Sequence, residues 1–300
     1  MITNKTVFIL GAGASAPFDF PTGYQLLQKI IGLTDSTKND LTIYNQCAFS
    51  LPEIEKFRQD LNRSQKRSID AFLEHRPEYI KLGKCLIMQA LLEYESFDAI
   101  YNKPDWYSYI WNKMNCKFDD FQSNEISFIT FNYDRSLEMY LLNCMPSLYN
   151  KSESECWEKL KSIPIIHVHG KLGEVKFDNP TEYTDFGEKI TSPEKLLSAS
   201  KSIKIVHEDI DNDKEFEEAI ILLRQASLVV FLGFGYDDNN LRRLRISEVG
   251  QLASGSIKGS SFGLTPNECS GLMRKYPNIT VTQYTNWETL EYLRNEVILE

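Results

Sequence analysis

Short apolar runs that end abruptly in polar or glycine residues recur along the chain. They occupy residues 6–10 (TVFIL), 126–131 (ISFITF), 163–168 (IPIIHV) and 227–232 (SLVVFL). Runs of this length bounded by turn residues are typical of buried parallel strands. Further along we expect a strand at 260–265, a helix opened by Pro266, a strand at 279–284 and an amphipathic helix near 287–299. The pattern predicts an α/β protein with a Rossmann-like doubly wound parallel sheet.

The pattern changes to helical spacing between about residues 47 and 116. Ile69, Phe72 and Leu73 follow it, as does the long segment YIKLGKCLIMQALLEYE, and no strand signal interrupts them. No proline- or serine-rich linker sets this stretch apart. We therefore expect residues 1–300 to form a single domain with a helical insertion at about 47–116.

Composition and charge narrow the class of protein. The net charge is −9, which gives no overall field that would attract a polyanion. The longest apolar runs are about half of what a membrane-spanning helix needs, and no signal segment opens the sequence. We expect a cytoplasmic protein with no direct contact to nucleic acid or membrane.

The six cysteines lie far apart, and no C-x-x-C pair that could start a zinc ribbon occurs. We interpret them as reduced and mostly buried thiols. The sequence therefore predicts no structural metal.

A glycine-rich loop follows the first predicted strand. The segment Gly11-Ala12-Gly13-Ala14-Ser15-Ala16 fits the pattern G-x-G-x-x-A, in which backbone N–H groups approach a pyrophosphate without side-chain obstruction. The alternative is a tight strand-to-helix turn that needs glycine only for its backbone conformation.

The loop departs from the dehydrogenase form of this pattern, in which a long helix starts at once. Pro17 and Pro21 disfavour helix just before them, so we expect the helix to start at Thr22 or Gly23. The longer loop suggests that it closes over part of a dinucleotide, and that hydride transfer is not the chemistry.

Polar residues also follow the next two strands. Asn132 and Asp134 come after 126–131, and Asp134 is a candidate cap for the following helix. His167 and His169 lie at i, i+2 in the third strand, where the alternation of side chains predicts that both point to the same face of the sheet. Such a pair is able to bind a metal, but no third ligand signature lies nearby.

These motifs together resemble the sirtuin superfamily, in which a GAGAS-type loop, a Gln-Asn-Ile-Asp motif (here FNYD) and a His-Gly pair follow in order. The sequence is more similar still to bacterial sirtuin-like NAD-hydrolysing proteins of antiphage defence, on the segments SIDAFLEHRPEYIKLGK and FLGFGYDDNNL. Deacylating sirtuins carry a four-cysteine zinc ribbon and a G-I-P-D-F-R loop, whereas this sequence has no such ribbon and reads FDFPTG at the loop.

The resemblance implies a role for each matching residue. His169 would be the catalytic base, and Asn132 would place the ribose and water. The implied NAD-binding residues are Gly11, Ala12, Gly13 and Ser15 at the pyrophosphate, Asp134 at the nicotinamide ribose and amide, and Gly233, Phe234 and Gly235 beside the adenosine.

The function that follows is an NAD glycohydrolase that releases nicotinamide and ADP-ribose, or cyclic ADP-ribose, and defends against phage by depleting NAD. The resemblance further implies homo-oligomers and a separate activating protein, such as a DNA translocase or a nucleotide-sensing partner. Two alternatives stay open: an NAD-dependent protein deacylase and a non-catalytic module that senses NAD or ADP-ribose.

Overall fold

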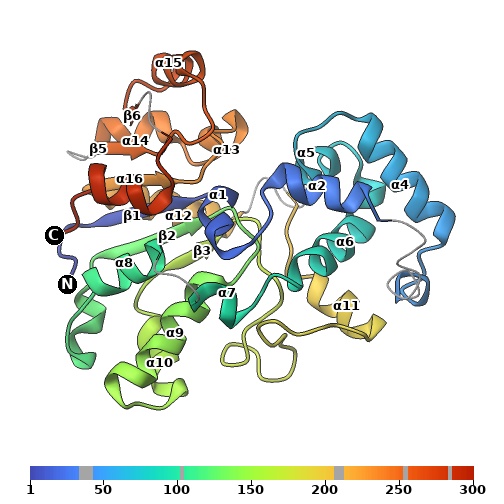
Figure 1. The fold of residues 1–300 in the computed structure, drawn as a ribbon, viewed down its shortest axis with the longest axis horizontal. Helices are drawn as coiled ribbons and strands as arrows, with labels where there is room; N and C mark the ends of the chain where they lie inside the picture. Colours follow the sequence, from blue (N-terminus) through green and yellow to red (C-terminus); the bar gives the residue numbers. More distant parts are fainter. Residues whose placement is uncertain (34–42, 102–104, 206–212, 253–255, 283–285) are drawn as a thin grey trace.

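The computed structural model contains one six-stranded parallel sheet, and it describes residues 1–33, 43–101, 105–205, 213–252, 256–282 and 286–300. The strand order is β3-β2-β1-β4-β5-β6, so the chain winds outward from β1 in both directions, as a doubly wound sheet does (Figure 1). The predicted fold class is confirmed. The strands are β1 (Thr6–Leu10), β2 (Ile126–Thr130), β3 (Ile165–His167), β4 (Leu228–Leu232), β5 (Ser256–Gly259) and β6 (Ile279–Val281).

Helices connect the strands and cover the sheet. They are α1 (Ala12–Ser15), α2 (Gly23–Ile31), α4 (Leu51–Arg63), α5 (Ile69–Leu73), α6 (Ile80–Leu92), α7 (Phe97–Tyr101), α8 (Trp106–Lys113), α9 (Ser136–Tyr149), α10 (Glu153–Leu160), α11 (Pro193–Ser200), α12 (Lys214–Gln225), α13 (Asp238–Arg243), α14 (Ile246–Leu252), α15 (Pro266–Lys275) and α16 (Thr289–Glu296). Short 3-10 turns lie at η1 (Ala16–Phe18), η3 (Pro77–Tyr79) and η4 (Phe118–Ser123). None of the described helices is long and apolar enough to cross a membrane.

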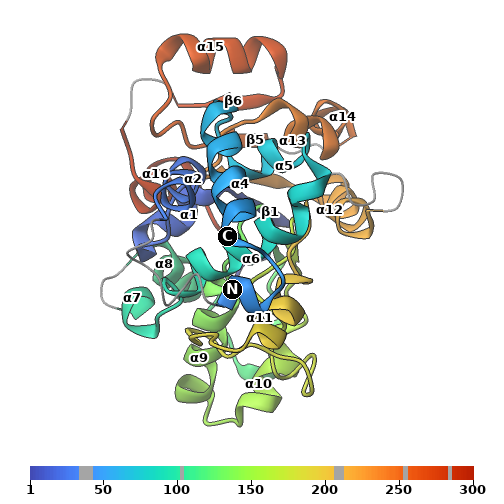
Figure 2. The same ribbon diagram turned by 90° about the vertical axis from the view of Figure 1, so that its right-hand side faces the viewer.

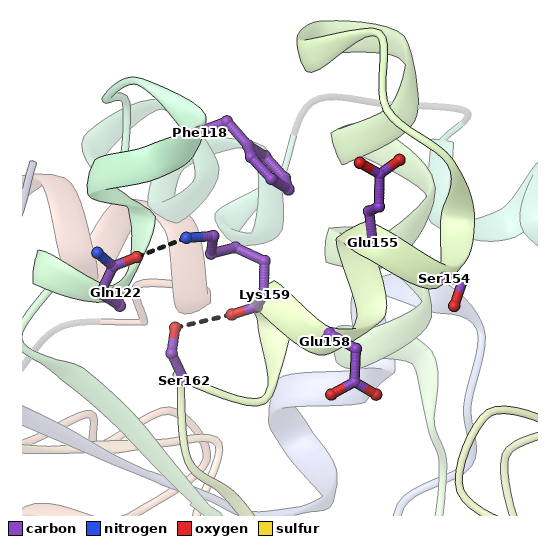
Figure 3. Close-up of a pocket in the computed structure, with 7 residues that line it drawn as sticks. All are labelled: Phe118, Gln122, Ser154, Glu155, Glu158, Lys159 and Ser162. Carbon is purple, nitrogen blue, oxygen red and sulfur yellow. Dashed lines mark hydrogen bonds between the residues drawn. The ribbon is translucent and has the colours of Figure 1, made fainter.

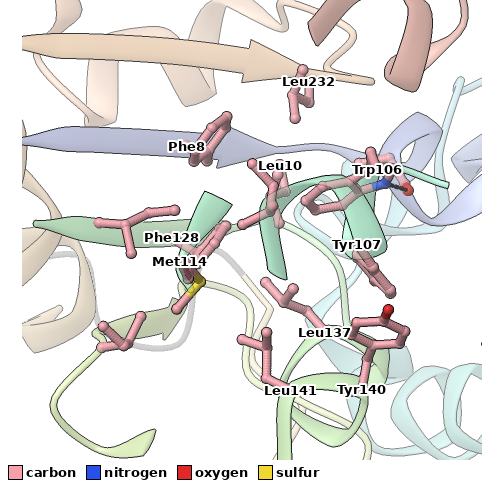
Figure 4. Close-up of a cluster of buried hydrophobic side chains, with 14 of the residues drawn as sticks. Phe8, Leu10, Trp106, Tyr107, Met114, Phe128, Leu137, Tyr140, Leu141 and Leu232 are labelled. Atoms are coloured by element: carbon pink, nitrogen blue, oxygen red, sulfur yellow. Dashed lines mark hydrogen bonds between the residues drawn. The ribbon is translucent and has the colours of Figure 1, made fainter. Parts of the chain in front are cut away.

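Alternate side chains of the strands pack into two different cores. Phe8, Leu10 and Phe128 face one side, where they pack against aromatic and aliphatic residues of α8 and α9 (Figure 4). Val7 and Ile9 face the other side, where α12, α13, α14 and α15 cover them. Because both faces are buried, the strands are almost entirely apolar, which is why they were visible in the sequence.

A third core lies apart from the sheet, within a helical module formed by α2, α4, α5, α6 and α11 (Figure 1). The module faces the viewer in Figure 2. The predicted insertion at about 47–116 is divided in this structure. Helices α4 to α6 belong to the module, whereas α8 packs on the sheet. Two helices from outside that stretch, α2 and α11, complete the module.

Most predicted elements are confirmed. Helix α2 starts at Gly23 with a capping box on Thr22, and the helices opened by Pro266 and near 287–299 are α15 and α16. The predicted strand at 260–265 is wrong, because the strand that pairs with β4 is Ser256–Gly259. The glycine loop also contains the short helix α1, which the proline argument did not anticipate. Residues 283–284 of the predicted strand at 279–284 lie outside the described residues.

All six cysteines are free, and four of them, Cys47, Cys85, Cys156 and Cys269, are buried. Burial raises the pKa of Cys85 to about 11, so its thiol stays protonated. The prediction of mostly buried thiols is confirmed.

Candidate functional site

The carboxyl ends of four neighbouring strands, β3, β2, β1 and β4, meet at one edge of the sheet. Ligands of doubly wound folds bind at this edge, beside the strand from which the chain winds in both directions. Here that strand is β1, which is followed directly by the glycine loop. Apart from Ala12 and Gly235, the predicted site residues contact one another or neighbouring residues at this edge.

The glycine loop after β1 is joined to the loop after β4 by direct backbone contact. Gly11 N–H donates to Leu232 O at 3.0 Å, and Gly13 N–H donates to Gly233 O at 2.9 Å. A Cβ on Gly11 would lie 2.6 Å from Gly233 O, and one on Gly13 would lie 2.8 Å from Gly233 Cα. Gly233 itself has a φ of +55°. The glycines therefore let two loops touch, in addition to any ligand they admit.

Asn132, at the end of β2, is hydrogen-bonded to the glycine loop. Its side-chain nitrogen donates to Gly11 O and to Ser15 Oγ, both at 2.9 Å. Ser15 Oγ in turn donates to Asp134 Oδ2 at 2.7 Å. Both N–H groups of the Asn132 amide are thereby used, and Oδ1 is its remaining polar side-chain atom.

Asp134 anchors the helix that follows. Its Oδ1 accepts from the backbone N–H of Ser136, the first residue of α9, at 3.2 Å, and from the Ser136 hydroxyl. Asp134 therefore hydrogen-bonds the first residue of α9, as a cap would, although the residue at the N-cap position is Arg135. Burial raises the pKa of the Asp134 carboxyl, while the hydrogen bonds from Ser136 and Ser15 act in the opposite direction. In this structure Asp134 is an internal acceptor for two loops.

His169 lies between the aromatic residues that flank Asn132. Its ring is 5.2 Å from that of Phe131 and 6.3 Å from that of Tyr133, measured between centroids. Only 7% of the residue is exposed, and its Nε2 is buried with no hydrogen-bond partner among the described residues. Burial lowers the pKa of His169, so the neutral imidazole is favoured.

Phe234 extends this aromatic group toward β4. Its ring centroid is 5.0 Å from that of Phe131, which connects the loop after β4 to His169. Gly235, by contrast, is exposed, and no described atom lies within 4 Å of where its Cβ would be. The structure thus brings Gly233 and Phe234 into the cluster and leaves Gly235 outside it.

His167 has partners of its own. Its Nδ1 lies 3.1 Å from Asn132 O and its Nε2 lies 3.0 Å from Glu138 Oε1 of α9. Sequence reasoning missed Glu138. A signal was available, because Glu138 is the only charged residue in the apolar run SLEMYLL. No group of three His, Cys, Asp or Glu residues in the described ranges is arranged to hold a metal ion.

Two surface pockets are lined by other residues than those described above. One is lined by Phe118, Gln122, Ser154, Glu155, Glu158, Lys159 and Ser162, with Lys159 donating to Gln122 (Figure 3). The other lies beside the FDFPTG loop and is lined by Ala16, Asp19, Phe20, Pro21, Gln25 and Tyr94. The second pocket adjoins the glycine loop through Ala16, whereas the first is formed by η4 and α10.

The fold and its edge define a Rossmann-like α/β protein with a buried polar cluster at the β1–β2–β3–β4 strand ends. No protein-family model and no curated protein matches the chain. Among solved structures it is similar to a Sir2 protein in complex with the inhibitor EX-527, 2′-O-acetyl-ADP-ribose and a deacetylated p53 peptide, at 18% identity and a TM-score of 0.43, over 96% of this chain and 90% of that one. It is also similar to Sir2Tm bound to a propionylated peptide, at 17% identity and a TM-score of 0.41, over 96% and 90% of the two chains.

Proposed function

We propose that this protein is an NAD glycohydrolase that cleaves NAD to nicotinamide and ADP-ribose, or to cyclic ADP-ribose. One observation carries the proposal. His169 presents a buried nitrogen, without a hydrogen-bond partner among the described residues, at the strand ends where the glycine loop and Asn132 meet. An unpaired buried polar atom costs about 1–3 kcal/mol, so a ligand hydroxyl or water that pairs with it is favoured.

The surrounding residues suit a dinucleotide substrate. The loop from Gly11 to Ser15 would lie along the pyrophosphate, beside Gly233 and Phe234 on the adenosine side. Asp134 would lie toward the nicotinamide ribose. Three of the loop N–H groups, those of Gly11, Gly13 and Ala14, already bond to carbonyls, so Ala12 N–H is the part of the loop we assign to phosphate.

The reaction requires a positioned base and a group that accepts a hydrogen bond from the attacking water. The bond between C1′ of the ribose and N1 of nicotinamide breaks, and nicotinamide leaves with its electron pair. Water adds to C1′ and gives its proton to His169 Nε2, which the lowered pKa keeps neutral and receptive. Asn132 Oδ1 would accept from the same water and hold it. If the adenine group of the substrate replaces water, the product is cyclic.

We further propose the biological role that the sequence resemblance implies, which is antiphage defence by NAD depletion. An enzyme that depletes NAD has to be kept inactive in an uninfected cell. We infer control by oligomerisation and by a separate protein, such as a DNA translocase or a nucleotide-sensing partner. The protein would act in the cytoplasm, where NAD is its substrate and no metal takes part.

The decisive experiment is product analysis of the wild-type chain and His169→Ala after incubation with NAD. In the activated state we expect nicotinamide release by the wild type and a loss of about 10²–10⁴-fold in the variant. His75→Ala is the matched control, because His75 is exposed and its side chain hydrogen-bonds the carbonyl of Ala71 in the adjacent α5.

The same incubation with an acetylated peptide separates the alternatives. Nicotinamide release only when the peptide is present would identify a deacylase and overturn the proposal. Binding of NAD without any release, in the presence of the activating partner, would identify a sensing module. Near-normal turnover by His169→Ala would remove that residue from the mechanism.

A further inference from the structure

Glu138 and His167 form a buried pair behind Asn132 that the mechanism above does not use. The two side chains are 7% and 9% exposed, and Glu138 Oε1 lies 3.0 Å from His167 Nε2. The other ring nitrogen, Nδ1, lies 3.1 Å from the backbone oxygen of Asn132. The pair therefore spans from α9, through the end of β3, to the end of β2.

The partners fix where the protons are. A backbone carbonyl only accepts hydrogen bonds, so His167 Nδ1 must carry a proton. The contact between Nε2 and the carboxyl oxygen needs one further proton, which resides either on the ring or on Glu138. The pair thus holds one shared proton, as an imidazolium with a carboxylate or as an imidazole with a carboxylic acid.

The electrostatic surroundings favour the ionised form of Glu138. Burial is the largest single influence and acts to raise its pKa, but the charge and hydrogen bond of His167, together with a backbone hydrogen bond and Lys171, make the net direction downward. Lys171 acts in the same direction as His167, and Glu138 in turn raises the pKa of Asp134 and of Arg135.

Asn132 connects this pair to the glycine loop. Its backbone oxygen is held by His167, while its side-chain nitrogen holds Gly11 O and Ser15 Oγ. The hydrogen bonds run without a break from α9 to the loop after β1. A shift of the His167 ring would move Asn132, and Asn132 would carry the loop with it.

We propose that Glu138 and His167 are positioning residues, which share a proton and hold Asn132 at the distance from the glycine loop that the site requires. Their effect on turnover rests on the proposed NAD cleavage. Their effect on the loop does not, since it follows from the hydrogen bonds alone.

Two variants of the full chain test this role. Glu138→Gln keeps a hydrogen bond to the ring, because a Gln amide group donates to Nε2 of a neutral His167 whose Nδ1 still donates to Asn132. The double variant Glu138→Leu/His167→Phe removes both hydrogen bonds without leaving an unpaired buried charge, a replacement that folded proteins often tolerate. Thermal unfolding of both proteins confirms that each is folded at the assay temperature.

Amide hydrogen exchange of residues 11–15 is the first readout. We expect it to be at least about tenfold faster in the double variant and unchanged in Glu138→Gln, because only the double variant releases Asn132. Unchanged exchange in the double variant overturns the proposal. This readout does not depend on whether the protein cleaves NAD.

NAD turnover is the second readout. We expect kcat to fall about 10²-fold in the double variant, as for a reacting group displaced by about 1 Å, and to stay within about threefold in Glu138→Gln. If Glu138→Gln loses as much as the double variant, the charge acts directly in the chemistry and the positioning role is wrong. If the wild type and both variants release no nicotinamide, the proposed function fails while the exchange result stands.

Discussion

Replacing Gly13 with alanine tests whether the two loops at the strand ends are joined as tightly as the structure has them. An ideal Cβ at this position lies 2.8 Å from Gly233 Cα and 3.0 Å from Gly233 O. Both are backbone atoms, so no side-chain rotation relieves the contact, and one loop has to move away from the other.

The magnitude follows from two terms. Overpacking of a well-packed site costs about 1–3 kcal/mol. Movement of the loops also weakens the bond from Gly13 N–H to Gly233 O, which contributes about 0.5–1.5 kcal/mol. We expect the free energy of unfolding to fall by roughly 2–4 kcal/mol. For a chain of this length that corresponds to a melting temperature lower by roughly 3–6 °C.

Gly235→Ala is the matched control. It lies two residues beyond Gly233, is exposed, and its Cβ would meet no described atom within 4 Å. Its substitution should change stability by less than about 0.5 kcal/mol. Urea unfolding of both variants measures the difference, and a Gly13→Ala protein as stable as the Gly235→Ala control would refute the reasoning.

NAD calorimetry on the same preparations, below the unfolding transition, then separates the two interpretations of the loop. If the loop binds phosphate, the folded Gly13→Ala protein binds NAD more weakly, because the displaced backbone no longer meets the ligand. If Gly11 and Gly13 serve only as a turn, affinity per folded molecule stays unchanged.

Three further outcomes are expected. Asn132→Ala should lower the free energy of unfolding by about 1–3 kcal/mol, because its buried hydrogen bonds are lost. It should also reduce the rate of nicotinamide release more than the affinity for NAD. Equal losses in kinetics and in calorimetry would make Asn132 a binding residue. Arg135→Met should destabilise by about 3–5 kcal/mol in urea, because it leaves the buried Glu95 carboxylate unpaired, and adding Glu95→Leu should recover most of that; no recovery would contradict the ion-pair argument. Burial lowers the pKa of His169, so the stability that its neutral ring contributes is fully present above the unfolded pKa of about 6.5 and is lost as pH falls below that value. His169→Phe should therefore flatten the curve of unfolding free energy against pH between about pH 7 and 5. An unchanged slope would argue against a buried neutral ring.

The sequence by itself determined the sheet and the approximate positions of the candidate site residues. Strands buried on both faces have to be continuously apolar, so β1, β2, β3 and β4 were legible as short runs, and parallel strands bring their carboxyl ends to one edge. The start of α2 was predictable as well, since Pro17 and Pro21 disfavour helix just before them, and the structure adds a local capping box of Thr22 and Gln25. The strand at 256–259 was not predictable, because SIKG is short and contains lysine, and its pairing with β4 and β6 is what selects it.

Only the tertiary structure decided how the polar groups are paired. Asn132 meets Gly11 across 121 residues, and Ser15 meets Asp134 across 119. The helical module likewise combines α11 with α2 and α4 to α6, although β2 and β3 lie between α6 and α11 in the chain. Periodicity and propensity act over a few neighbouring residues, whereas hydrogen bonds and packing between distant segments depend on how the whole sheet closes. Hence the sequence indicated which residues end the strands, and only the fold showed that Glu138 holds His167 and that Gly13 rests on Gly233.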